Sequence, residues 1–190
     1  DDIAQVLALL GVCPEWEPMS GRVTGFKIIP YTALGRPRVD VTLRISGFFR
    51  DAFPYQVELI DTAIQRVAGL DEPEKFNPLA ALAAAERMNL SSSGANPETA
   101  FRRSTARVFG SKPGAYGAGL QSLIDEGIWE TQEDFATAYL KWGSFVYGSK
   151  LEGETEEELF RTRLSKVQVV LHNQDNREHD ILDSDDYYQF

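Results

Sequence analysis

The sequence predicts an α/β fold in which helices outnumber the strands of a small sheet. Apolar residues recur three or four positions apart in several segments, as in residues 55–68, and this spacing indicates amphipathic helices. Residues 38–46 alternate strictly between apolar and polar side chains, which is typical of a strand. The apolar run at 166–172 predicts a second, buried strand that leads directly into a polar segment.

The first third of the chain predicts a helix followed by strands. Acidic residues open the first apolar segment and Gly11 closes it, which are typical helix start and stop signals. Residues 13–22 have the composition of a loop, and residues 22–30 alternate loosely and predict a strand. After the strand at 38–46 we expect a bend, with Asp51 as the N-cap of a helix that ends near Ala68.

The remainder of the chain predicts further helices around one glycine-rich loop. Five helices are expected, over residues 79–89, 96–108, 120–126, 131–147 and 154–165. Gly110–Gly119 separates the second of these from the third. In open α/β sheets, ligands gather at the carboxyl ends of strands. We therefore expect functional residues after the strands at 38–46 and 166–172.

Composition excludes several classes of protein. The net charge of −10 argues against a nucleic-acid binder and against an anionic membrane surface as partner. No run of about 18 apolar residues is present to span a bilayer. Cys13 is the single cysteine, which excludes a disulfide framework within the chain and fits the reducing cytoplasm. Because the chain opens with Asp1 and stops at an aromatic Phe190, we expect a piece of a larger multidomain protein.

The segment HNQDNREHDILDSDDYYQF, residues 172–190, contains both histidines of the chain and a cluster of carboxylates. Imidazole and carboxylate together are ligands for first-row divalent metals, and histidine accepts protons near neutral pH. The alternative is a solvated loop in which Arg177 pairs with a neighbouring aspartate. Its position directly after an apolar strand favours a functional role.

Two further segments are candidates for binding anions. The loop FGSKPGAYGAGLQ, residues 109–121, combines glycine amides with Lys112 and precedes a helix, but it matches neither the phosphate loop of ATP-binding proteins nor the dinucleotide fingerprint. The alternative is a tight structural turn. Residues 35–54 contain four arginines that could bind carboxylates bidentately: Arg36, Arg38, Arg44 and Arg50. The alternative is that they form internal salt bridges with Asp40, Asp51 or Glu58.

Four segments in fixed order resemble one protein family. They are GRPRVDVTLRISGFFRDAFP, RVFGSKPGAYGAGLQSLIDEGIW, AYLKWGSFVYG and HNQDNREHDILDSDDYYQF. Together they closely resemble the large subunits of cobaltochelatases of the CobN type, which are related to the magnesium chelatase large subunits. The resemblance covers residues 1–190 as part of a family domain, with residues 35–190 as its matching core and residues 1–34 as a less distinctive lead-in. The motifs GSKPGAYGAGLQ and NREHDILDSDDYYQF favour the cobalt branch.

The resemblance implies a tetrapyrrole substrate, hydrogenobyrinic acid a,c-diamide, and cobalt(II) as the metal that is inserted. It also implies two partner subunits, an AAA+ ATPase that hydrolyses ATP and a subunit with a metal-binding adhesion domain. The absence of an ATP loop from the sequence agrees with hydrolysis on a partner.

Metal insertion requires a metal site, a base for the pyrrole protons and groups that hold the substrate's carboxylates. Residue types suited to the metal are His172, Asp175, His179 and Asp180, and those suited to proton transfer are His172, Glu178 and His179. The candidates for binding the substrate are Arg36, Arg38, Arg44, Arg50, Lys112, Tyr116 and Arg177.

Three alternatives remain open at this point. The chain could belong to the magnesium branch, which inserts magnesium into protoporphyrin. It could be a platform that docks the ATPase subunits, with the acidic residues 152–158 as the partner surface. It could also be a carrier of cobalt or tetrapyrrole without insertion activity.

Overall fold

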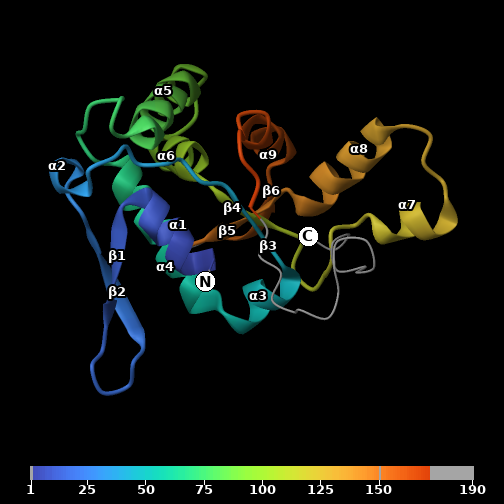
Figure 1. Ribbon diagram of the computed structural model, residues 1–190. Helices are drawn as coiled ribbons and strands as arrows, with labels where there is room; N and C mark the ends of the chain where they lie inside the picture. Colours follow the sequence, from blue (N-terminus) through green and yellow to red (C-terminus); the bar gives the residue numbers. More distant parts are fainter. Residues whose placement is uncertain (1, 150, 172–190) are drawn as a thin grey trace. The chain divides into compact units, whose positions relative to one another are not determined.

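The computed structural model describes residues 2–149 and 151–171, which divide between two compact units (Figure 1). The first unit contains the chain up to Val41 together with Glu58–Arg107. The second contains Thr42–Val57 and the chain from Val108 onward. Helices predominate and the strands form two small sheets, so the predicted helix-rich α/β class is confirmed.

The first unit combines a two-stranded hairpin with helices. Its elements are α1 (Asp2–Leu10), β1 (Val12–Trp16), β2 (Val23–Ile28), α2 (Tyr31–Leu34), most of α4 (Pro54–Ala68), α5 (Pro78–Ser92) and α6 (Pro97–Thr105). Strands β1 and β2 pair antiparallel, and helices α5 and α6 pack against each other. The apolar face predicted for α4 is confirmed, because Ile60, Ile64 and Val67 are fully buried.

A buried ion pair between Arg38 and Glu72 connects two segments of the first unit. The Arg38 guanidinium donates from Nε and Nη2 to the two carboxylate oxygens of Glu72, at 2.7 and 2.8 Å. It also donates to backbone oxygens of Leu10, Gly11 and Ile29. Every guanidinium nitrogen of Arg38 therefore has a partner within this unit, and the pKa of Glu72 is lowered, chiefly by its hydrogen bond from Arg38.

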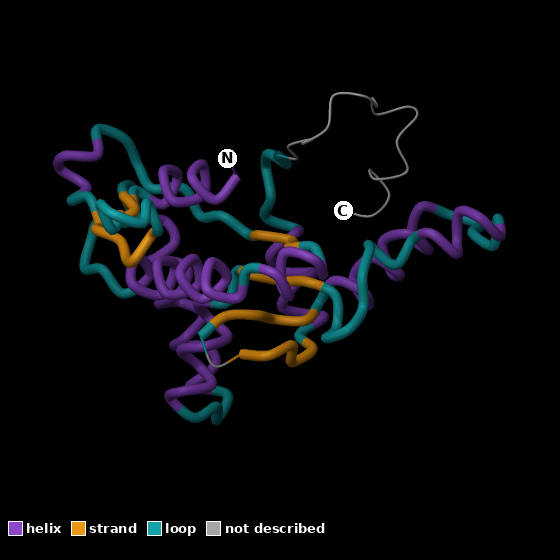
Figure 2. Tube along the Cα trace, turned by 90° about the horizontal axis from the view of Figure 1, so that it is seen from below, coloured by secondary structure: helices purple, strands orange, loops and turns teal. Residues whose placement is uncertain are grey.

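The second unit is built on a four-stranded sheet with the order β3-β4-β5-β6. Strands are drawn in orange in Figure 2. Its elements are β3 (Leu43–Ile45), α3 (Gly47–Ala52), β4 (Val108–Gly110), α7 (Gln121–Glu126), α8 (Gln132–Gly143), β5 (Phe145–Gly148), β6 (Leu151–Thr155) and α9 (Glu157–Leu164). Strands β3 and β4 are parallel, and the other two pairings are antiparallel. The glycine-rich loop follows β4 and α3 follows β3, so the two lie at the same edge of the sheet.

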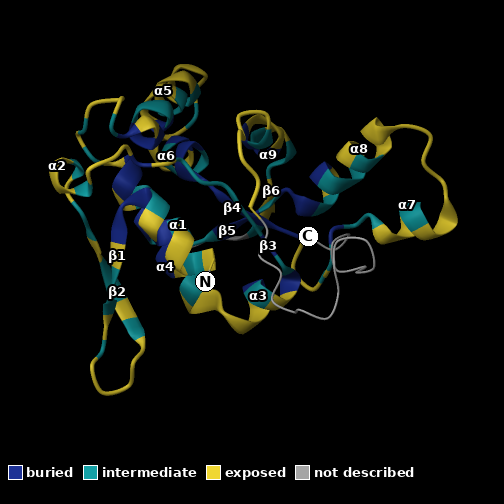
Figure 3. Ribbon diagram, viewed as in Figure 1, coloured by how far each residue is buried: buried dark blue, intermediate teal, exposed yellow. Residues whose placement is uncertain are grey.

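Aromatic packing fixes helices α8 and α9 against this sheet. The rings of Phe109 on β4 and Phe160 on α9 are both fully buried and stack with their centroids 4.7 Å apart. Tyr139 on α8 also stacks on Phe160, at 5.9 Å. The buried colour of β4 and β5 in Figure 3 marks this core.

Several predicted elements differ from the structure because tertiary contacts override local pattern. The strand expected at 38–46 is reduced to Leu43–Ile45, since its first part is held by the side chain of Arg38 rather than by a strand ladder. Residues 13–16, expected in a loop, pair with β2 instead. The helix expected over 96–108 ends at Thr105, and Val108–Gly110 joins the sheet as β4.

Two other helices end or begin differently from their predicted limits. The helix expected to continue to residue 147 ends at Gly143, because the residues from Phe145 onward pair with β4 and β6 as strand β5. Residues 151–155, partly expected in a helix, form β6.

The buried strand expected at 166–172 is wrong over the residues that the structure describes. Residues 167–171 have no strand pairing, and their aliphatic side chains are exposed, with Val170 at 82%. The sequence pattern cannot show that pairing is missing, because an apolar run has the same pattern whether or not a neighbouring strand is available to pair with it.

We predict that Glu72→Gln destabilises the protein by about 3 to 5 kcal/mol, since it leaves the buried Arg38 charge without a counter-charge. The free energy of unfolding in urea measures the effect. Glu15→Gln is the matched control, because Glu15 pairs with Lys27 at 3.0 Å where both side chains are exposed, and we expect a loss below about 1 kcal/mol. Equal losses in the two variants would contradict the prediction.

Candidate functional site around the glycine-rich loop

The predicted site residues fall into three groups. Six lie outside the described residues: His172, Asp175, Arg177, Glu178, His179 and Asp180. Two arginines, Arg36 and Arg38, belong to the first unit. The second unit brings the other four together around the glycine-rich loop: Arg44, Arg50, Lys112 and Tyr116.

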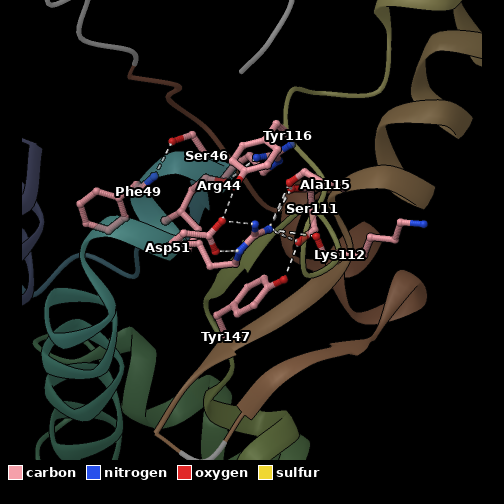
Figure 4. Close-up of polar contacts among 11 residues, drawn as sticks. Arg44, Ser46, Phe49, Asp51, Ser111, Lys112, Ala115, Tyr116 and Tyr147 are labelled. Atoms are coloured by element: carbon pink, nitrogen blue, oxygen red, sulfur yellow. Dashed lines mark hydrogen bonds and ion pairs between the residues drawn. The ribbon is translucent and has the colours of Figure 1, made fainter.

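Arg50 lies at the centre of this arrangement (Figure 4). It projects from helix α3, whose N-cap is Ser46: the Ser46 hydroxyl oxygen accepts a hydrogen bond from the Phe49 amide at 3.0 Å. The Nη1 atom of Arg50 donates to three backbone oxygens of the loop, those of Ser111, Lys112 and Ala115, at 3.1, 2.9 and 3.2 Å. The loop therefore turns these carbonyl groups towards the guanidinium of a buried arginine.

Asp51 completes the coordination of Arg50. Its carboxylate accepts from Arg50 Nε at 2.6 Å and from Nη2 at 2.8 Å, and it also accepts from the Tyr116 hydroxyl at 2.7 Å. The hydrogen bonds from Arg50 and Tyr116 lower the pKa of Asp51 to about 2. Asp51, expected from the sequence as the N-cap of α4, thus connects α3 to the loop instead; the N-cap assignment is wrong.

Two tyrosine rings enclose the Arg50 guanidinium. Its central carbon lies 5.6 Å from the ring centre of Tyr116 and 5.7 Å from that of Tyr147. The Tyr147 hydroxyl donates to the Ser111 carbonyl oxygen, so strand β5 also contacts the loop. A planar guanidinium suits this position because it can stack and donate hydrogen bonds at the same time, which an ammonium group cannot.

The far end of the loop is fixed by a second arginine. Arg44 Nη2 and Trp142 Nε1 both donate to the Gly117 carbonyl oxygen, at 2.9 and 2.8 Å. The Arg44 guanidinium also lies 5.9 Å from the ring centre of Tyr139, and burial lowers its pKa. Its Nε atom is buried and has no hydrogen-bond partner among the described residues.

Gly47 permits the close approach of the loop to helix α3. A Cβ atom at this position would lie 2.6 Å from the Ala115 oxygen and 2.8 Å from Cδ1 of Tyr116. Any side chain there would clash with the loop backbone and the Tyr116 ring, so one of them would have to move. The motif SGFFRD therefore supplies the cap, the space and the two charged groups that hold the loop.

The candidate residues differ in what remains available to a ligand. Arg38 is saturated by partners of the chain, and Arg36 donates to the backbone oxygens of Ala8, Leu9 and Pro37. Lys112 is exposed, and among the described residues it has no ion pair; its ammonium points away from the Arg50 network in Figure 4. Tyr116 exposes 58% of its surface. Their predicted roles in binding substrate stay predictions.

The sequence indicated part of this site and not the rest. The alternative that Asp51 forms an internal salt bridge with the arginine cluster is confirmed by its ion pair with Arg50, at 2.6 Å. Its contact with Tyr116, 65 positions away, had no signal in the sequence. Ser111 lies in the glycine-rich loop that the sequence indicated, but its contact with Arg50 was not predicted. Tyr147 was not predicted at all, because it reaches the loop from a strand that was expected to be helix. In the part of the chain that the structure describes, no group of three or more metal-ligating side chains is present.

The loop attachment is expected to depend on pH through Asp51. Because its pKa is lowered from 3.8 to about 2, its contribution to stability is fully present above about pH 4 and is lost as the pH falls through about 2. We predict that Asp51→Asn lowers the thermal midpoint at pH 6 and that the difference from wild type shrinks steadily as the pH falls from about 4 to below 2. A difference independent of pH would contradict this assignment, and Glu133→Gln, on the exposed start of α8, is the control.

Comparison with known proteins places the chain in a family. The family model described as CobN/Magnesium Chelatase matches residues 1–190. The chain is 57% identical over its whole length to the aerobic cobaltochelatase subunit CobN of Pseudomonas aeruginosa, of which it covers 15%. It is 32% identical to a magnesium-chelatase subunit of Chlorobaculum parvum, over 98% of the chain and 14% of that protein.

A solved structure is also similar over the full chain. The catalytic subunit of cobaltochelatase from Mycobacterium tuberculosis matches with a TM-score of 0.90 at 48% identity, and the match covers 100% of this chain and 16% of that one. None of the helices within the described ranges has the length and hydrophobicity that a membrane span requires. The full-length match to the family model shows that the chain belongs to the CobN/magnesium chelatase family.

Proposed function

We propose that the chain is a segment of the large subunit of a cobaltochelatase, which inserts cobalt(II) into a tetrapyrrole. The observation that carries this proposal is the similarity of the whole chain, in sequence and in structure, to cobaltochelatase subunits. The substrate that we propose is hydrogenobyrinic acid a,c-diamide, and the pathway is aerobic cobalamin biosynthesis. The lower identity to the magnesium enzyme favours cobalt over magnesium.

Insertion requires the metal to lose its water ligands and the ring to lose two pyrrole protons. We assign these steps to the polar segment that begins at His172, since imidazole and carboxylate groups serve both purposes. His172, His179, Asp175 and Asp180 are the proposed metal ligands. Glu178 and the two histidines are the proposed proton acceptors.

The loop that Arg50 holds is the proposed contact for the substrate. Lys112 is exposed and has no ion pair within the described ranges, which leaves its charge available for a carboxylate. Arg44 and Arg50 act through the loop, because their hydrogen bonds go to its carbonyl groups and to Asp51. We therefore propose that these two arginines position the substrate contacts, and that Lys112 and Tyr116 touch the substrate.

ATP hydrolysis is proposed to take place on a partner. The chain has no phosphate loop, and insertion by this family would then depend on an AAA+ ATPase subunit and a partner with an adhesion domain. We propose that the complex works in the cytoplasm. An alternative is that the chain belongs to the magnesium branch. Its support is that both branches belong to the same family, and a preference for magnesium in an insertion assay would reveal it.

We predict that replacing both His172 and His179 by alanine lowers the rate of cobalt insertion at least about 100-fold while ring binding is retained, because a metal ligand and a proton acceptor are lost together. The assay uses the full-length subunit with its ATPase partners and follows the change in the absorption spectrum of the tetrapyrrole.

The matched control replaces two acids on α9, Glu157 and Glu158, by alanine. Within the described ranges these acids form surface ion pairs with Arg161, at 3.7 and 3.9 Å, so we expect unchanged insertion. Loss of complex assembly in this control, with insertion intact in the histidine variant, would instead support a docking platform and would overturn the assignment of chemistry to residues 172–180.

A further inference from the structure

Three carbonyl groups of the glycine-rich loop are fully occupied by side chains. The carbonyl oxygens of Ser111, Ala115 and Gly117 each accept two hydrogen bonds. The donors are five side chains of the second unit: Arg44, Arg50, Ser111, Tyr147 and Trp142. The orientation of these three carbonyl groups is therefore fixed by the contacts that hold the loop, as Figure 4 shows for Ser111 and Ala115.

The amide that follows each of these carbonyl groups points the opposite way. The peptide bonds of the loop are trans, and in a planar trans peptide the C=O of one residue and the N–H of the next are antiparallel. The amides of Lys112, Tyr116 and Ala118 therefore point away from the side chains that bind the carbonyl oxygens. None of these three amides donates a hydrogen bond to a described residue.

The Ala118 amide is a buried donor that the described part of the chain leaves unsatisfied. Ala118 exposes 2% of its surface, so bulk water has little access to its backbone. A buried N–H without a partner costs free energy, and such groups are rare in native structures. This amide is therefore a donor that an acceptor group of a ligand can satisfy.

Two glycines give the loop the backbone conformation that presents these amides. Gly114 and Gly117 have φ values of 77° and 78°, which side chains rarely allow, and a Cβ atom at either position would meet nothing within 4 Å. Glycine is thus required here by conformation and not by packing. Turns that contain left-handed residues are the setting in which successive backbone amides bind anions.

The charge of the loop favours an anion as the ligand. Residues 109–121 contain Lys112 as their single charged residue. Its ammonium group points away from the Arg50 network in Figure 4, and it has no ion pair among residues 2–149 and 151–171. The carboxylate of Asp51, which also contacts the loop, is bound by two nitrogens of Arg50. Amide donors together with one free cation suit a carboxylate, whose oxygens only accept hydrogen bonds.

Resting on the function proposed above, we infer that the main-chain amides of Lys112, Tyr116 and Ala118 bind a carboxylate of the tetrapyrrole together with the Lys112 ammonium. The loop thereby distinguishes a carboxylate from a carboxamide. A carboxamide carries an NH2 group, which cannot accept from these donors, and it has no charge to attract Lys112. The loop thus selects the amidation state of one side group of the substrate.

The test compares two probes on the full-length subunit, with dissociation constants taken from the change in their absorption spectrum. One probe is hydrogenobyrinic acid a,c-diamide, and the other is the same ring with its remaining carboxylates converted to amides. We expect wild type to prefer the first probe at least about tenfold, the loss typical of a charge-assisted hydrogen bond. Lys112→Met is expected to reduce this preference about threefold or more. Lys141→Met is the matched control, because Lys141 is an exposed lysine of α8 in the same unit.

Gly117→Ala tests the backbone amides. Because the φ of 78° strains any side chain, we expect the peptide group between residues 117 and 118 to turn. Binding of the carboxylate probe should weaken about threefold to tenfold, with binding of the amidated probe unchanged. Gly94→Ala is the matched control, since Gly94 has a φ of 88° and equally open surroundings but lies between α5 and α6 in the first unit. Equal losses in the two variants would overturn the inference.

Different outcomes separate this inference from the proposed function. Equal binding of both probes by wild type, with cobalt insertion intact, would overturn the carboxylate site and leave the function standing; amides satisfied by water would give that result. Failure of the wild-type complex to bind either probe would overturn both. If Gly117→Ala lowers the thermal midpoint, Lys112→Met decides, because it leaves the backbone unchanged; an undiminished preference in that variant overturns the inference.

Discussion

The second unit depends on one guanidinium group. Arg50 donates to the carbonyl oxygens of Ser111, Lys112 and Ala115, binds Asp51 through two nitrogens and lies between two tyrosine rings. A buried cation is unfavourable unless its hydrogen-bonding groups are satisfied, and here the loop backbone and one carboxylate satisfy them. The loop has this conformation because its carbonyl groups face the cation, and the cation is tolerated because the loop surrounds it.

The same chemistry recurs in the first unit with a different consequence. Arg38 is also buried and bound bidentately, but its carboxylate comes from Glu72 and its other bonds go to the backbone of α1, the turn between α1 and β1, and the residue after β2. Nothing of Arg38 is left to contact a ligand, whereas the Arg50 network exposes Tyr116 at its surface. Two arginines of one sequence motif thus serve a structural core and a candidate binding surface.

The sequence indicated two segments of the candidate site but not the contacts that join them. The motif around Arg50, the glycine-rich loop and Lys112 were identified as anion-binding candidates, and the structure brings them together. The sequence could not show that Arg50 donates hydrogen bonds to the loop, because the acceptor oxygens of the loop lie more than 60 positions away in the chain. The four arginines are divided between the two units for the same reason. Although they are close in sequence, their side chains contact residues that belong to different units.

The sequence by itself determined the helix-rich class, the amphipathic helix α4, the glycine-rich loop and the family, because local periodicity, turn residues and long motifs carry this information directly. Tertiary structure alone decided that Val108–Gly110 and Phe145–Gly148 are strands, that residues 38–42 are not, and that Asp51 joins a tyrosine instead of capping a helix. Short strands are stabilised by their neighbours in the sheet and not by their own residues. Their positions, and the site that rests on them, follow only when distant parts of the chain pack together.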